Sequence, residues 1–370
     1  MDLASLIGSR GWNQLQHHFQ HKQTTLGRAD DRDRFHELWS EWELEAVLTC
    51  VALTAADSIR IVTQGKSIKP IAYRDRNGLL VADAVAQLRK AGASINIMRA
   101  EDYSNRILAL SRSLEEAFSC PVQCNLYVTP GQAQGLGAHH DSHDVLILQL
   151  RGEKHWEIEG FGGATTGGVA ASILKTGDWL FVPRGVRHEV RNRAPEPSVH
   201  LAIGFHPLTW GDVLQVALDT ARKSVPALNE AVEVSADSAV LRSTIEPKLL
   251  ALVPHVDVAE QHRRYHGSFP CLGLPVPRSD TPACKNPDVG DENTRFAWRT
   301  ESASFEGLLG AGAIDLPFRR SPLVLRPELR DAIRRMHERR EFCPAELGLA
   351  TAQAVRLCRL LANVAVLRMT

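Results

Sequence analysis

The segment from Asn125 to His188 contains the residues that decide the fold expected of this chain. Its most informative parts, in chain order, are Asn125-Leu126-Tyr127-Val128-Thr129-Pro130, His139-His140-Asp141, Gly152-Glu153-Lys154-His155-Trp156, Gly177-Asp178-Trp179-Leu180-Phe181-Val182-Pro183 and finally His188. Short apolar runs separated by glycine and proline turns are typical of buried strands. The pattern predicts most of a double-stranded β-helix, a barrel of short strands.

His139 and Asp141 form an H-x-D pair. Alternate residues of a strand point to the same face, so the imidazole and the carboxylate would lie side by side. His188 follows the turn Pro183-Arg184-Gly185 and can return to the same point from a neighbouring strand. Two histidines and one carboxylate on one side of a metal are the ligand set of non-haem iron oxygenases. We therefore expect Fe(II) at these three residues, with open positions for O2 and a co-substrate.

Lys154 is expected to point into the barrel. In the strand that follows the turn at Gly152, Lys154 shares one face with Trp156 and Ile158, and the more polar residues occupy the other face. A buried ammonium group is costly unless an anion pairs with it. The dicarboxylate 2-oxoglutarate would supply that anion as co-substrate. Asn125 and Tyr127, which alternate with apolar residues on an earlier strand, can add hydrogen bonds to it.

As a set, these motifs resemble the JmjC-type ribosomal oxygenases, which are cupin-like iron(II)/2-oxoglutarate protein hydroxylases. The resemblance is strongest over about residues 90–215 and also includes Gln134-Gly135, Asp144-Val145 and Gln149-Leu150. It implies iron on the two histidines and the aspartate, with 2-oxoglutarate on Lys154 and Asn125. The implied activity is hydroxylation of an arginine or histidine side chain of a ribosomal protein. The family also implies a homodimer, a helical dimerisation segment and a C-terminal winged-helix-like domain.

The sequence departs from the family pattern at several places. Ala138 stands where the family usually has proline, and Ala202 and Gly204 stand where relatives often carry hydroxyl groups. The segment 160–168 is short and rich in glycine. These differences leave the expected metal ligands in place and bear on which substrate is bound.

Two further histidines have open roles. His143 shares the parity of His139 and Asp141, and we expect it either at the substrate mouth or, with slight preference, on a surface turn. His200 resembles a family position at the inner face of the barrel, and a histidine of the apolar core is an equal alternative. His140 should point away from the metal.

The composition is that of an ordinary globular protein. The 370 residues are 44% hydrophobic and 23% charged, with a formal net charge of +0, so bulk charge does not indicate nucleic-acid binding. Seven cysteines without a C-x-x-C pair favour reduced thiols over a disulfide framework. The N-terminus lacks the features of a signal sequence, and no apolar run is long enough to span a membrane. We expect a cytoplasmic protein.

The expected class is α+β, with three parts. Residues 1–208 would form the oxygenase domain, with its barrel core at about 122–206 and an N-terminal α/β elaboration. In that elaboration we expect helices over 39–54, 82–91 and 103–118, and strands over 59–62 and 94–97. The polar residues 1–40 would form an arm over the core or, with preference, a solvated surface segment. Residues 209–300 would form the helical dimerisation segment, beginning at a capping box at Thr209-Trp210-Gly211-Asp212, and a linker over 271–300.

Residues 301–370 are expected to be a winged-helix-like domain. A helix would start near Pro327, a second would cover 352–364, and a strand would close the chain at 365–369. From residue 314 onward there are eleven arginines and six acidic residues. This excess would suit nucleic acid, but the arginines are mixed with acids and lack stacking aromatic residues, so we favour solvated helix faces.

Three functions compete at this stage. The first is hydroxylation of a ribosomal protein. The second is a tailoring hydroxylase that acts on a free amino acid or a biosynthetic peptide with the same scaffold. The third is a non-catalytic, metal-binding dimeric scaffold, which an intact ligand set and an inward-facing lysine disfavour.

Overall fold

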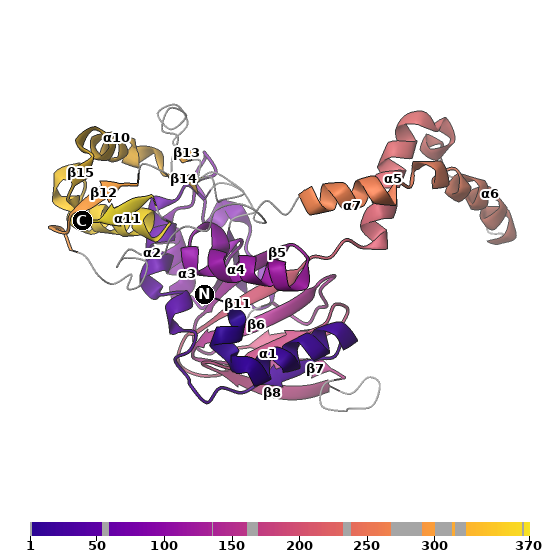
Figure 1. Cartoon of the computed structure of the whole chain (residues 1–370), viewed down its shortest axis with the longest axis horizontal. Helices are drawn as coiled ribbons and strands as arrows, with labels where there is room; N and C mark the ends of the chain where they lie inside the picture. Colours follow the sequence, from indigo (N-terminus) through magenta and orange to yellow (C-terminus); the bar gives the residue numbers. More distant parts are fainter. Residues whose placement is uncertain are drawn as a thin grey trace. The chain divides into compact units, whose positions relative to one another are not determined.

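The computed structural model describes residues 2–53, 59–134, 136–160, 169–231, 238–267, 291–299, 313–314, 323–364 and 366–370 (Figure 1). The chain divides into two compact units, one formed by residues 1–205 with 271–370 and the other by residues 206–270. The first unit mixes strands and helices, as expected for the α+β class. The second is built from helices.

Two antiparallel sheets form the barrel. The larger has eight strands in the order β1(Thr25–Gly27), β9(Trp179–Val182), β6(Asp144–Arg151), β11(Ser198–Phe205), β5(Val122–Thr129), β4(Ser94–Ile97), β2(Ile59–Thr63) and β3(Lys66–Ser67). The smaller has the order β10(His188–Arg191), β7(Glu153–Glu159) and β8(Val169–Lys175). Apolar side chains from both sheets form one inner cluster, made of Val145, Ile147, Trp156, Ile158, Leu174, Leu180, Val182 and Val190. The strands between residues 122 and 205 therefore enclose a common interior. This agrees with the alternation of inward-facing and outward-facing residues that the sequence predicted.

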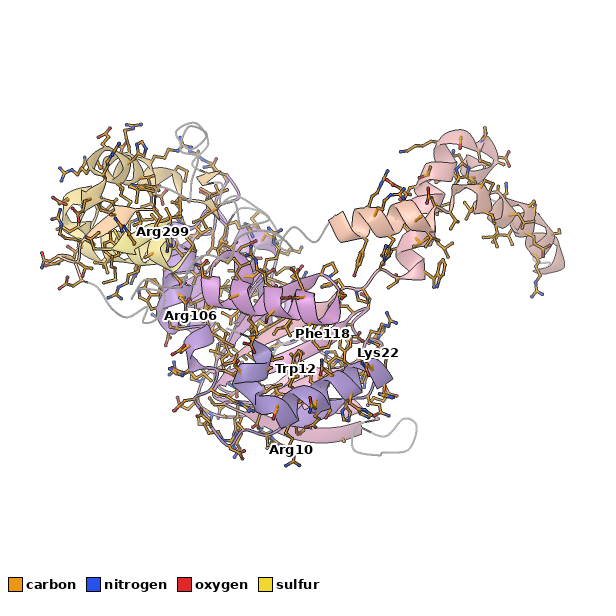
Figure 2. All side chains as sticks on the ribbon, viewed as in Figure 1. Arg10, Trp12, Lys22, Arg106, Phe118 and Arg299 are labelled. Atoms are coloured by element: carbon orange, nitrogen blue, oxygen red, sulfur yellow. The ribbon has the colours of Figure 1, made fainter. Side chains whose placement is uncertain are left out.

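Helices cover the outer face of the larger sheet. They are α1(Leu3–His21), α2(Glu41–Cys50), α3(Ala82–Lys90) and α4(Asn105–Phe118), with short 3-10 turns at η1(His36–Leu38), η2(Pro70–Ala72) and η3(Ala100–Asp102). Helices α2, α3 and α4 and strands β2 and β4 lie where the sequence predicted them. The preferred interpretation of residues 1–40, a solvated surface segment, was wrong. The alternative, an arm over the core, is confirmed for α1, which buries Leu3, Ile7 and Leu15. Its Trp12 packs edge-on against Phe118 of α4, with ring centroids 5.6 Å apart (Figure 2).

The C-terminal segment packs on α2. It contains β12(Phe296–Trp298), β13(Ala313–Ile314), β14(Leu323–Val324), η7(Pro327–Leu329), α10(Arg330–Arg339), β15(Glu341–Phe342), η8(Pro344–Leu347), α11(Thr351–Asn363) and β16(Leu367–Met369). The buried amide of Asn363 donates to the buried carboxylate of Glu43 at 2.7 Å. This contact ties α11 to α2, and the segment clusters with the barrel in the first unit.

The predicted helices near 327 and 352 and the closing strand are present. Residues 271–300 were expected to be an irregular linker. This was wrong at Phe296–Trp298, which form strand β12 and pair with β15 and β16. Residues 271–290 and 300 of that linker lie outside the described residues. The winged-helix assignment and the three domain boundaries stay predictions.

The second unit contains α5(Trp210–Ser224), η5(Pro226–Asn229), α6(Ser238–Leu250), η6(Val253–His255) and α7(Val258–Gly267). The capping box predicted at its start is confirmed, because the Thr209 hydroxyl accepts from the backbone N–H of Asp212 at 3.2 Å and the Asp212 carboxylate accepts from the Thr209 N–H at 2.9 Å. In the part of the chain that the structure describes, no helix has the length and apolar character needed to cross a membrane.

Candidate metal centre and co-substrate cavity

His139 and His188 are held together by their own backbones. The N–H of His139 donates to the carbonyl of His188 at 3.0 Å, and the N–H of His188 donates back at 2.8 Å. Residues paired in this way across antiparallel strands have adjacent side chains. The two imidazole centroids are accordingly 4.5 Å apart. The chain thus brings these residues together from 49 positions apart, counted from 139 to 188.

Asp141 completes the group. One carboxylate oxygen lies 3.8 Å from Nε2 of His139, and the other lies 3.6 Å from Nε2 of His188. One donor atom from each of the three side chains can be chosen so that all lie within 4.8 Å of one another. The structure therefore gathers the three residues that the H-x-D pattern and the later histidine predicted. His140 is exposed, in agreement with its exclusion.

The hydrogen bonds of the two imidazoles prepare them to bind a metal. Nδ1 of His139 lies 2.8 Å from the carbonyl of Gly137, and Nδ1 of His188 lies 3.0 Å from the carbonyl of Val186. A carbonyl oxygen only accepts, so each Nδ1 carries the proton and each Nε2 presents a lone pair toward Asp141. Burial lowers the pKa of His188 and favours its neutral, ligating form.

This donor set fits iron(II). Two neutral imidazole nitrogens and one carboxylate on the same side of a point can occupy three adjacent positions of an octahedral metal. The remaining positions would open into a cavity of about 560 Å³, which all three residues line. The geometry suits an ion that must also bind other molecules.

Lys154 faces this cavity, as its strand parity predicted. It is 1% exposed, and its Nζ donates to the hydroxyl of Thr129 at 2.8 Å. Burial lowers the pKa of Lys154 to about 7. Desolvation thus opposes the ammonium form, and the hydroxyl supplies no negative charge to compensate. An anion in the cavity would stabilise the charged form.

The spacing between Lys154 and the metal group suits a short diacid. His188 pairs with Ile158 of β7, four residues beyond Lys154 on the same strand. At about 3.3 Å per residue these positions are roughly 13 Å apart along the strand. The lysine side chain and a five-carbon dicarboxylate can together bridge that distance.

Asn125 and Tyr127 both line the cavity. The side-chain oxygen of Asn125 accepts from the backbone N–H of Arg99 at 3.2 Å and from the side chain of Gln123 at 3.0 Å, which orients its amide. Burial raises the pKa of Tyr127 to about 12, so its hydroxyl is a neutral donor. Their expected contacts with a co-substrate stay predictions.

Thr129 was missed at the sequence level. It belongs to the motif from Asn125 to Pro130, but a β-branched residue at the end of a strand is more often structural. No residue next to it in the sequence indicates a contact with Lys154. His143 was expected, with slight preference, on a surface turn. It is instead a half-buried residue that lines the cavity, which suits the alternative position at the mouth.

The two facing sheets form a cupin-like fold, and residues 97–165 match the JmjC domain family. The resemblance seen in the sequence is thereby confirmed.

Among curated proteins, the chain is similar to the bifunctional lysine-specific demethylase and histidyl-hydroxylase NO66 of Dictyostelium discoideum, with 31% identity over 36% of this chain and 29% of that protein. It is also similar to ribosomal oxygenase 1 of Bos taurus, with 29% identity over 57% of this chain and 34% of that protein. The matched region thus spans about a third of these relatives. A solved structure of YcfD, a ribosomal oxygenase from Escherichia coli, in complex with cobalt and 2-oxoglutarate aligns over 97% of this chain and 98% of that chain, with 16% identity and a TM-score of 0.42.

We predict that Asp141→Ala abolishes stoichiometric binding of Co(II), because it removes the only charged donor of the triad and leaves two imidazoles. The dissociation constant measured by calorimetry should rise at least about 100-fold, the scale on which even outer-sphere changes act. His140→Ala is the matched control, since it removes the adjacent exposed imidazole and should leave the affinity unchanged. Equal cobalt affinity in Asp141→Ala and the unaltered protein would exclude the assigned site.

Proposed function

We propose that this protein is an Fe(II)/2-oxoglutarate-dependent oxygenase that hydroxylates an amino-acid side chain of a ribosomal protein. The observation that carries the proposal is the buried ammonium group of Lys154 in the same cavity as His139, Asp141 and His188. A metal triad alone suits many reactions. A triad with an inward-facing cation across the cavity suits a metal-chelating dicarboxylate.

In this proposal each part of the site has a separate task. Bound iron would supply oxygen activation coupled to oxidative decarboxylation of 2-oxoglutarate. His139, Asp141 and His188 would hold the ion and leave its cavity side open. Lys154 and Thr129 would bind the distal carboxylate. The apolar walls, formed by Val145, Ile147, Trp156, Val182 and Val190, would exclude water from the reacting centre.

Turnover of 2-oxoglutarate tests this assignment. Lys154→Met keeps an unbranched side chain of nearly the same length and removes the cation. KM for 2-oxoglutarate should therefore rise about 100-fold, as expected for a lost charge-assisted contact of roughly 3 kcal/mol. Binding needs protonated Lys154, whose pKa is about 7 in the free protein. KM should therefore increase as pH rises above about 7 in the unaltered protein but not in Lys154→Met. A KM that Lys154→Met leaves unchanged would remove the basis of the proposal.

The charge of the cavity favours histidine over arginine as the target. Among the described residues that line it, Asp141 is the only carboxylate, and the metal would neutralise it. Lys154 and Arg60 add positive charge to the lining of the same cavity. A guanidinium stays protonated at any physiological pH and would enter without an anionic partner. A neutral imidazole could instead bond to the amides of Asn96, Gln123 and Asn125. One of the relatives is named a histidyl-hydroxylase, which agrees with this choice.

Mass spectrometry of ribosomal proteins can identify the target residue. Cells that carry the gene should contain one ribosomal protein with an additional oxygen atom on a histidine, and cells that carry Asp141→Ala should lack it. An additional oxygen on arginine would refute the charge argument while leaving the oxygenase assignment intact. Unmodified ribosomal proteins, together with an oxidised free amino acid or biosynthetic peptide, would favour the tailoring hydroxylase. Absence of any 2-oxoglutarate turnover would favour the non-catalytic scaffold.

We further propose that the helical unit mediates a homodimer, in a cytoplasmic protein. Large apolar side chains are exposed on this unit, and those of Trp210, Leu250 and Val253 are 68%, 67% and 62% exposed. Leu214, Leu249 and Val253 line an apolar groove within the unit. Exposed apolar groups gathered on a few helices are typical of an association surface.

Light scattering tests the dimer. Leu250→Asp places a charge in the exposed apolar group and should halve the molar mass in solution. Ile71→Asp is the matched control, because Ile71 is 87% exposed on the other compact unit and lies outside the proposed surface. A monomeric unaltered chain, or a dimer that persists in Leu250→Asp, would refute the assignment.

A further inference from the structure

His200 lies inside the barrel beside Lys154. In the register of the larger sheet it is directly opposite Tyr127 of β5, and Ser198 is opposite Thr129. Thr129 is the residue that accepts the hydrogen bond from Lys154. Two residues along a strand return to the same face, so His200 is the diagonal neighbour of Thr129 on the cavity side. It therefore occupies the end of the cavity where the ammonium group lies.

Aromatic rings fix the orientation of the His200 imidazole. It stacks on Tyr127 with parallel planes and a centroid separation of 4.8 Å. Trp156 of the smaller sheet meets it edge-on at 6.0 Å. His200 is 4% exposed, so its ring has little freedom to turn. The ring is thus held between the two sheets at a defined angle.

The Nδ1 atom of this ring is buried and has no hydrogen-bond partner in the described structure. A buried polar atom without a partner is destabilising, and nearly all buried polar atoms in native proteins have a hydrogen-bond partner. Burial and the nearby Lys154 lower the pKa of His200, so the imidazole is neutral and carries one N–H. That N–H can donate without introducing a second charge.

We propose that His200 selects the co-substrate by donating its ring N–H to the distal carboxylate, on the side opposite the hydrogen bond from Lys154. The inference rests on the proposed function and adds a residue to it. A carboxylate has two oxygens and about four acceptor directions, so a lysine and a hydroxyl leave at least one of them unused. The fixed imidazole donates a hydrogen bond along that direction, which strengthens the binding of an oxoacid that carries a second carboxylate. An oxoacid without the distal carboxylate gains nothing from it.

Direct binding separates this role from a structural one. The dissociation constants of 2-oxoglutarate and of 2-oxopentanoate, which has the same chain length but no distal carboxylate, can be measured by calorimetry with Mn(II) in the absence of oxygen. His200→Leu keeps an apolar side chain of similar size and removes the donor. The constant for 2-oxoglutarate should rise about 10- to 100-fold, the range for a hydrogen bond to a charged group. The constant for 2-oxopentanoate should change less than about twofold.

Two further variants complete the comparison. His200→Asn retains an amide donor close to the position of Nδ1 and should recover most of the affinity for 2-oxoglutarate. His155→Leu changes a histidine on the outward face of β7 and should alter neither constant, since the His155 ring bonds to Glu153 and does not line the cavity. Thermal unfolding of each variant establishes that it is folded.

The outcomes are distinct. Equal weakening of both oxoacids in folded His200→Leu assigns His200 to structure alone and overturns the proposal, as does unchanged affinity for 2-oxoglutarate. If His200→Leu does not fold, the ring ¹⁵N signals of His200 in the unaltered protein decide: they should shift when 2-oxoglutarate is added and stay in place with 2-oxopentanoate. Identical shifts with both oxoacids would overturn it. Failure of the metal-loaded, unaltered protein to bind 2-oxoglutarate would refute the proposed function itself.

Discussion

Two backbone hydrogen bonds between His139 and His188 are the constraint on which the site depends. They join the loop before β6 to the first residue of β10, and they fix the separation of the two imidazoles before any metal is bound. The carbonyls of Gly137 and Val186 then set the tautomer of each ring. Because backbone groups fix both the positions and the tautomers of the imidazoles, few other side chains are needed to orient the ligands. Neighbouring sequence can vary, as at Ala138, while the ligand geometry is maintained.

The second constraint is the opposite end of the cavity, where burial acts against a cation. Lys154 has one neutral hydroxyl partner, and His200 has a buried nitrogen without a partner. Burial of each group without an anionic or hydrogen-bonding partner destabilises the folded protein. One carboxylate bound between them could accept a hydrogen bond from both. Strain of this kind is common at binding sites, where the free protein bears a cost that the ligand removes. The two ends of the cavity together define a ligand that chelates at one end and carries negative charge at the other.

The sequence allowed prediction of what depends on strand parity. The inward side of Lys154 follows from the period of two, and the turn before His188 indicated a return to the metal site. The H-x-D pair was also expected on a strand, but it lies in the loop before β6, where His139 forms an isolated β-bridge with His188. Contacts across strands could not be predicted, because register is set by the whole sheet. The hydrogen bond from Lys154 to Thr129 is therefore absent from any local pattern, and so is the stacking of His200 on Tyr127. Helix α1 was missed because only three of its 19 residues are buried, which gives a weak apolar period.

A crystal structure of the protein with Co(II) and 2-oxoglutarate tests the central claim most directly. The account predicts a metal ion bound by Nε2 of His139, Nε2 of His188 and the carboxylate of Asp141, with the oxoacid end of the ligand on the metal. It predicts the distal carboxylate within hydrogen-bond distance of Nζ of Lys154. A metal bound elsewhere, or a distal carboxylate that faces solvent and leaves Lys154 with Thr129 alone, would contradict it.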